Sequence, residues 1–180
     1  IEDKKIVDKE AESWLRVVET KALSAYALAR AVKPDALRFF ILFGSVAGRY
    51  GNAGQADYGV ANELLNRLAW QLRALWPRTV KIAVLNWGPW AGTRYGSGMV
   101  SEETRRKFAA KGVDLIAPEG GALACREEIL YGPIDDVEIV VGEGGWERRE
   151  TAQGAMRAWA IVAPAAAAST ALRAGGEIRL

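Results

Sequence analysis

The sequence predicts an α/β fold built around a parallel sheet. Segments with helical and with strand-like patterns alternate three times between residues 9 and 143. The strand-like segments are apolar runs, which is typical of strands that helices cover on both faces. With 180 residues, half of them apolar, the chain is long enough for one ordinary domain with its own core.

The first helix is expected from Lys9 to Val32, where apolar residues recur at three- and four-residue steps. Lys21 falls on the same face as this apolar stripe, which consists of Trp14, Val17, Val18, Ala22, Ala25, Leu28, Ala29 and Val32. Pro34 ends the helix. The run RFFILFGS, residues 38–45, then has the length and composition of a strand buried on both sides.

A glycine-rich turn after Ser45 leads into a second amphipathic helix, expected from Asp57 to Trp76 and stopped by Pro77. The apolar stripe of this helix carries two polar side chains, Tyr58 and Asn62, one turn apart. A second strand, VKIAVLNWG at 80–88, follows the helix and leads into the glycine-rich segment GPWAGTRYGSG. We expect a lid over a site at about residues 88–113.

Three further elements complete the pattern. Ser101 has the character of a cap for a short helix that ends near Gly112. A third long helix is expected from Pro118 to Tyr131, because proline favours the first helical position and Gly132 and Pro133 end it. The last strand is expected at 137–143.

Beyond Glu147 the composition becomes rich in alanine, and we expect no further strand of the main sheet there. Residues 148–180 are interpreted as a linker towards a following domain, although GGEIRL at the end can open a new strand. The chain also begins without methionine and in the middle of a pattern. We therefore expect it to be a piece of a longer polypeptide.

Composition excludes several classes of function. The net charge of +2, from 24 basic and 22 acidic side chains, favours neither nucleic-acid nor membrane binding. The absence of histidine and the single cysteine, Cys125, exclude histidine-based catalysis, a disulfide framework and the common metal sites. The charged N-terminus and the lack of a long apolar run indicate a cytoplasmic protein without a secretion signal or transmembrane helix.

Catalysis without histidine must use tyrosine, lysine, serine or carboxylates. Ser45 lies where a parallel strand ends, which is where ligands bind in open α/β sheets, and Tyr58 and Asn62 point back towards that turn. A phenol needs a nearby cation to act near neutral pH, and Lys21 can provide it. Each residue also has an ordinary interpretation: a core tyrosine, a lysine that reaches solvent, a capping serine and an asparagine bound to the backbone.

This sequence has a serine at a strand end, a tyrosine thirteen residues later, the spacing Tyr-x-x-x-Asn, and a lysine on the preceding helix. This combination of residues resembles the short-chain dehydrogenase/reductase family. The stretches LFGSVAGRYGNAGQADYGVAN and LNWGPW are similar to ketoreductase domains of polyketide synthases and polyunsaturated fatty acid synthases. In these domains lysine and asparagine exchange the places they have in the wider family, as Lys21 and Asn62 do here. The resemblance covers residues 1 to about 147, as the C-terminal half of a Rossmann-like fold.

The resemblance implies reduction of a β-ketoacyl thioester on an acyl carrier protein, with NADPH as the hydride source. Tyr58 is then the proton donor, Ser45 binds the carbonyl oxygen, and Lys21 lowers the tyrosine pKa and holds the nicotinamide ribose. Asn62 supports a proton relay. Asn86 and the turn of Gly88, Pro89 and Trp90 are expected beside the nicotinamide and acyl chain.

The sequence also departs from the family. It has no glycine-rich turn for the pyrophosphate after a first strand, so the cofactor half of the fold is missing. We therefore expect weak or no NADPH binding and little activity by the chain alone, with an apolar edge at strand 38–45. Tyr50 stands where ketoreductases of one stereochemical class carry tryptophan, which leaves the product configuration open.

Three other functions remain compatible with the residues. The chain can be a non-catalytic structural or docking module of a large synthase. Whether the chain is catalytic or not, the other domains of that synthase are its expected partners. It can also be a free-standing carbonyl reductase. The tryptophans of LNWGPWAG can alternatively form a platform for a sugar or peptide.

Overall fold

The computed structural model describes residues 2–92, 101–110 and 112–144, together with short strands at 157–160, 172–174 and 177–179. The chain divides into two compact units. The first comprises Ile1–Asn86 and Pro133–Glu138, and the second comprises Trp87–Gly132 and Ile139–Leu180.

The first unit begins with a long helix in three parts. A 3₁₀ turn, η1 (Ile6–Asp8), precedes α1 (Ala11–Val18), the π-helical turn η2 (Glu19–Leu23) and α2 (Ser24–Ala31). The helix expected from Lys9 to Val32 is thus confirmed, with a π turn at its centre that the spacing did not predict. Pro34 starts the short turn η3 (Pro34–Ala36), which leads to the sheet.

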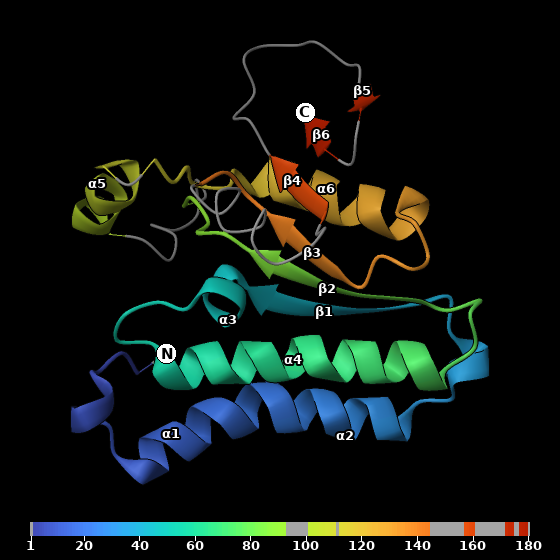
Figure 1. Ribbon diagram of the computed structural model, residues 1–180, viewed down its shortest axis with the longest axis horizontal. Helices are drawn as coiled ribbons and strands as arrows, with labels where there is room; N and C mark the ends of the chain where they lie inside the picture. Colours follow the sequence, from blue (N-terminus) through green and yellow to red (C-terminus); the bar gives the residue numbers. More distant parts are fainter. Residues whose placement is uncertain are drawn as a thin grey trace. The chain divides into compact units, whose positions relative to one another are not determined.

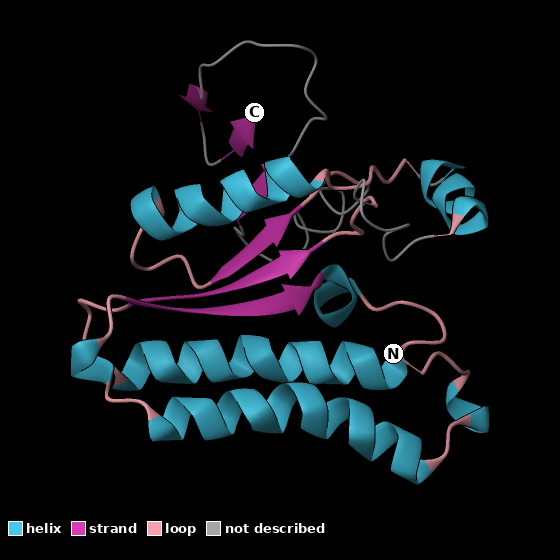
Figure 2. Ribbon diagram, turned by 180° about the vertical axis from the view of Figure 1, so that it is seen from behind, coloured by secondary structure: helices cyan, strands magenta, loops and turns pink. Residues whose placement is uncertain are grey.

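The helix α4 (Ala56–Leu75) lies between this long helix and strand β1 (Phe39–Ser45), as both Figure 1 and Figure 2 show. Its buried stripe packs on one face of β1, so that the core of the unit forms between helix and sheet. The core consists of Ala29, Phe40, Leu42, Leu65, Leu68, Ala69, Leu72, Val80, Ile82, Val84 and Val137. The expected second helix is therefore confirmed, within one residue at each end.

The burial of strand β1 differs from the burial that the sequence predicts. Phe40 and Leu42 face the core, but Phe39 and Phe43 on the other face are 48% and 52% exposed. The expectation of burial on both sides is wrong because, in this chain, α4 covers one face and β1 stands at the end of the strand order. An apolar run thus identified the strand without revealing how many of its faces are covered.

Strand β2 (Lys81–Trp87) is buried along its whole length. Within the first unit its Lys81 N–H donates to Arg38 O at 2.9 Å, and Val84 N–H donates to Val137 O at 2.7 Å. The strand order is β1-β2-β3-β4-β6-β5, in which β1-β2-β3 form a parallel sheet. The predicted α/β fold class is confirmed.

The second unit contains α5 (Glu102–Ala110), α6 (Pro118–Tyr131) and most of β3 (Glu138–Val141). The Ser101 Oγ accepts a hydrogen bond from the Thr104 N–H at 3.2 Å, which confirms the predicted cap of α5. The helix α6 has the bounds that its proline and glycine predicted. Its C-cap is Gly132, whose N–H donates to Glu128 O.

Three short strands follow in the alanine-rich tail: β4 (Arg157–Ala160), β5 (Leu172–Ala174) and β6 (Glu177–Arg179). The backbone of β4 pairs parallel with β3, with Val140 opposite Ala158, so the expectation of no further strand in the main sheet is wrong. Alanine has a low intrinsic strand preference, and this pairing depends on the neighbouring backbone rather than on composition. The strand expected within GGEIRL is confirmed as β6, which pairs with both β4 and β5.

None of the helices in the described ranges combines the length and apolar character needed to cross a membrane.

Candidate active site

Ser45 ends β1 and caps the short helix α3 (Val46–Tyr50). Its Oγ accepts a hydrogen bond from the Ala47 N–H at 3.2 Å, which fixes the side chain at the turn. Because this bond uses a lone pair of Oγ, the hydroxyl proton can be donated to another group. The structure thus places Ser45 at the carboxyl end of β1, as predicted.

Lys21 lies in the π turn η2 and reaches the last part of β1. Its Nζ donates to Phe43 O at 2.8 Å and lies 5.8 Å from the centre of the Tyr58 ring. Burial lowers the pKa of Lys21 because desolvation disfavours the ammonium form. A cation at this distance from an aromatic ring also interacts favourably with its π system. The structure therefore brings Lys21 and Tyr58 together.

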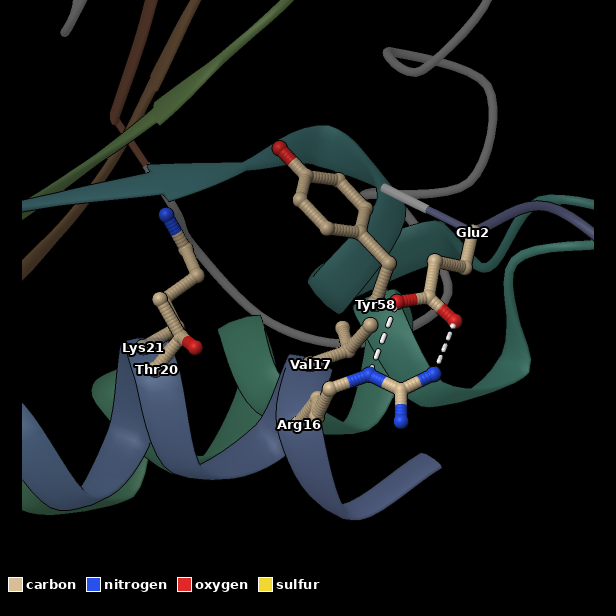
Figure 3. A pocket seen from close by; sticks show the side chains of 6 residues that line it. All are labelled: Glu2, Arg16, Val17, Thr20, Lys21 and Tyr58. Atoms are coloured by element: carbon tan, nitrogen blue, oxygen red, sulfur yellow. Dashed lines mark hydrogen bonds and ion pairs between the residues drawn. The ribbon is translucent and has the colours of Figure 1, made fainter. Parts of the chain in front are cut away.

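Tyr58 and Lys21 line one pocket of the first unit, with Glu2, Arg16, Val17 and Thr20. In Figure 3 both side chains extend from their helices in the same direction, away from the Arg16–Glu2 pair. Two hydrogen bonds of 3.2 and 3.1 Å join the Arg16 guanidinium to the Glu2 carboxylate. The hydrogen bonds that Glu2 accepts from the Arg16 guanidinium lower its pKa to about 2.

Glu2 and Arg16 were not predicted as site residues. Arg16 lies on α1 one turn before Lys21, but Glu2 is distant in sequence from Tyr58, and no spacing rule connects them. Their ion pair is largely solvent-exposed, and such pairs contribute little to stability. Its importance is that it places a carboxylate and a guanidinium on the wall of the pocket.

Asn62 is completely buried. Its Nδ2 donates to Tyr58 O at 2.7 Å, one turn earlier on α4. A Cβ on Gly48 would come within 2.7 Å of the Asn62 Cβ, so α3 approaches α4 closely at this point. Asn62 thus lies beneath the backbone of Tyr58 and does not line the pocket with Lys21.

Asn86 lies inside the first unit, fully buried at the end of β2. Its Nδ2 donates to Asn66 Oδ1 at 3.0 Å, and Asn66 in turn donates to Glu63 at 2.8 Å. A Cβ on Gly44 would lie 2.3 Å from Asn86 Oδ1, so only glycine fits on β1 beside this amide. Sequence reasoning missed Asn66, although a second asparagine one turn after Asn62 on the buried stripe was a usable signal.

Gly88, Pro89 and Trp90 belong to the second unit and are firmly anchored there. Gly88 N–H donates to Val141 O, and Pro89 O accepts from Ile116 N–H, both at 2.8 Å. The Trp90 ring lies 4.8 Å from that of Trp87, and a Cβ on Gly121 of α6 would approach it to 2.2 Å. The middle of the expected lid, residues 93–100, lies outside the described residues.

The sequence matches the model of one protein family, described as KR domain, over residues 1–92. The match covers half of the chain. The chain belongs to the KR domain family.

Relatives with known names support this ketoreductase assignment. The chain is 33% identical over 142 residues to a polyunsaturated fatty acid synthase of Thraustochytrium sp., covering 79% of the chain and 5% of that protein. It is 31% identical over 158 residues to polyketide synthase GfsB of Streptomyces halstedii, covering 87% of the chain and 3% of that synthase.

A solved structure supports the same fold. The ketoreductase from the first module of phoslactomycin biosynthesis in Streptomyces sp. HK803 superposes with a TM-score of 0.68 at 29% identity. The alignment covers 81% of this chain and 31% of that one. The KR chain thus spans about a third of a solved ketoreductase and a small part of the synthases it resembles.

Proposed function

We propose that this KR chain supplies the catalytic half of a ketoreductase in a polyketide or fatty acid synthase. Its substrate is a β-ketoacyl thioester carried by an acyl carrier protein, and its product is the β-hydroxyacyl thioester. The observation that carries the proposal is the pair of Lys21 and Tyr58, with Nζ 5.8 Å from the ring centre, in a pocket near the carboxyl end of β1. The relatives named above are synthases, so other synthase domains are the proposed partners.

The residues of the pocket suit a nicotinamide cofactor. The Lys21 ammonium uses one proton for Phe43 O and has two more for the hydroxyls of a ribose, and Tyr58 offers a phenol beside it. When bound, NADPH would supply the hydride that reaches the carbonyl carbon. We assign Gly88, Pro89 and Trp90 to the cofactor and acyl-chain side of the site as part of this proposal.

The chain's own residues would supply the proton and hold the reacting oxygen. The Tyr58 hydroxyl donates its proton to the ketone oxygen, and the Ser45 hydroxyl donates a hydrogen bond to the same oxygen. The positive charge of Lys21 stabilises the phenolate that this transfer leaves on Tyr58. Asn62 holds the backbone of Tyr58 through its bond to the carbonyl oxygen.

We infer that the ketoreductase part extends to about residue 147 and that residues 148–180 lead towards another domain. Because β4 pairs with β3, the sheet itself extends beyond that boundary. The first half of the fold, which would hold the pyrophosphate, is assigned to a separate part of the complete domain.

The decisive experiment uses the complete domain, in which this chain is joined to its cofactor-binding half. NADPH oxidation is followed with a β-ketoacyl thioester as substrate, for the wild type and for Tyr58→Phe. Loss of the proton donor lowers kcat by about 10²- to 10⁴-fold, a typical contribution of general acid catalysis. Tyr26→Phe, at an exposed tyrosine on α2, is the matched control and keeps the wild-type rate.

Two outcomes would contradict the proposal. Turnover that survives in Tyr58→Phe would remove Tyr58 from the role of proton donor. If the wild type neither turns over nor binds NADPH, the chain is better explained as a structural or docking module. For the chain alone, we expect an NADPH titration to show weak binding or none.

A further inference from the structure

A buried ion pair lies directly beside the tyrosine of the site. Lys9, just before α1, and Asp57, in the first turn of α4, approach to 2.5 Å between Nζ and Oδ2. Their side chains are only 4% and 2% exposed. Isolated charges at this depth are strongly unfavourable, so each is tolerated because the other is present.

The pair is connected to Tyr58 through the backbone. Asp57 Oδ1 accepts a hydrogen bond from the Tyr58 N–H at 2.9 Å. The cap residue Gln55 makes no side-chain bond to the helix, so the Asp57 carboxylate also provides the negative charge that the start of α4 favours. A shift of this carboxylate would therefore move the first turn of α4, which carries Tyr58.

Lys9 also connects Asp57 to another residue that lines the pocket. Its ammonium also donates to the backbone carbonyl of Glu2, and Glu2 lines the pocket with Tyr58. Two more bonds tie this N-terminal segment to the turn before α4. Lys4 N–H donates to Gly54 O at 3.0 Å, and Gln55 Nε2 donates to Asp3 Oδ2 at 2.9 Å.

The two catalytic helices are thus joined at their adjacent ends. Lys9 stands at the start of the helix that carries Lys21, and Asp57 stands at the start of the helix that carries Tyr58. We propose that the Lys9–Asp57 pair is a positioning device, which sets the separation of the Tyr58 ring and the Lys21 ammonium. This inference rests on the proposed function for its kinetic consequence, but its geometric content is independent of activity.

The test compares Lys9→Met, Asp57→Asn and the double variant. Each single variant leaves one partner without its counterpart and lowers Tm, whereas the double variant removes both charges and recovers much of the stability. Positioning predicts that kcat of the complete domain still falls by about 10- to 100-fold in the double variant, with KM within about twofold. The exposed pair Arg78–Asp135 of the first unit provides the control, and Arg78→Met leaves kcat unchanged.

A second readout needs no turnover. In the chain itself, the nuclear Overhauser contact between the Lys21 ε-methylene protons and the Tyr58 ring is expected to weaken in the double variant. If kcat and this contact both recover with Tm, the pair is only structural and the inference is wrong. If the wild-type domain has no activity, the proposed function fails, while the contact still decides whether the pair positions Tyr58.

Discussion

At the scale of single residues, the position of Lys21 lowers the stability of the folded protein. It is half-buried, it donates to Phe43 O, and desolvation lowers its pKa below the ordinary 10.5. A lysine with a lowered pKa disfavours the folded state wherever the unfolded chain carries the charge. A cation in such a place is better explained by chemistry near Tyr58 than by packing.

This argument predicts a difference in pH dependence between the wild type and Lys21→Met. Between the lowered pKa and 10.5, the unfolded chain binds more protons at Lys21 than the folded chain does, so stability from this group rises with pH. We expect Lys21→Met to lose that rise, and to have an unchanged or slightly higher Tm at neutral pH. Thermal unfolding from neutral pH to 10.5 measures the difference. An identical rise in both proteins would show that Lys21 is not desolvated.

Sequence patterns identified Lys21 and Tyr58 because each is a polar residue on an apolar stripe. Their closeness depends on helix packing, which the stripes predict, and the structure brings both into one pocket. The partnership of Lys9 with Asp57 was not predictable in this way. It joins residues distant in sequence, and a charged residue outside an apolar stripe gives no sign of burial.

At the scale of elements, the π turn η2 is the least expected feature of the fold. It interrupts a helix whose apolar spacing of three and four residues is compatible with an unbroken α-helix, so periodicity alone did not detect it. A π turn accommodates one extra residue, and such turns are frequent at functional sites. Here it contains Lys21.

Deleting Glu19 tests the purpose of this turn. Removal of one exposed residue from the π turn allows a regular α-helix, in which Arg16 and Lys21 stand four residues apart and stay on one face. We expect nearly unchanged helix content by circular dichroism, an unchanged or higher Tm, and slower turnover in the complete domain, because the local backbone that presents Lys21 to Tyr58 changes. Glu19→Ala, which keeps the residue count, is the control. Full activity in the deletion variant would show that the turn has no role in the site.

The other elements show which sequence signals suffice to predict a helix or strand and its neighbours. Proline and glycine determined both ends of α6 because they act locally: Pro118 lacks an N–H, and a Cβ on Gly132 would come to 2.5 Å from Glu128 O. The burial of β1 and the pairing of β4 depend on which other segments lie beside them. Local patterns therefore predicted element type well, and predicted strand neighbours poorly.

At the scale of the whole molecule, the exposed side of β1 indicates that the part of the chain that the structure describes leaves one face of this strand uncovered. Phe39 and Phe43 lie on one face of the terminal strand and are about half exposed. An apolar strand with an open edge and an open face can associate with further copies. In the proposed domain, the cofactor-binding half would cover this surface.

The exposed rings of β1 lead to one prediction for the chain alone and to a different one for the complete domain. In the chain alone, Phe39→Thr/Phe43→Thr removes two exposed rings from a site of contact between copies, and we expect self-association to weaken on the order of tenfold or more, measured by sedimentation equilibrium. In the complete domain, the same rings would be buried, and the double variant lowers Tm instead. Leu64→Gln on α4, a residue of similar exposure away from β1, changes neither result by as much. If self-association is unchanged and the complete domain keeps its Tm, β1 is not the surface that the other half covers, and the proposed division of the domain between two halves is wrong.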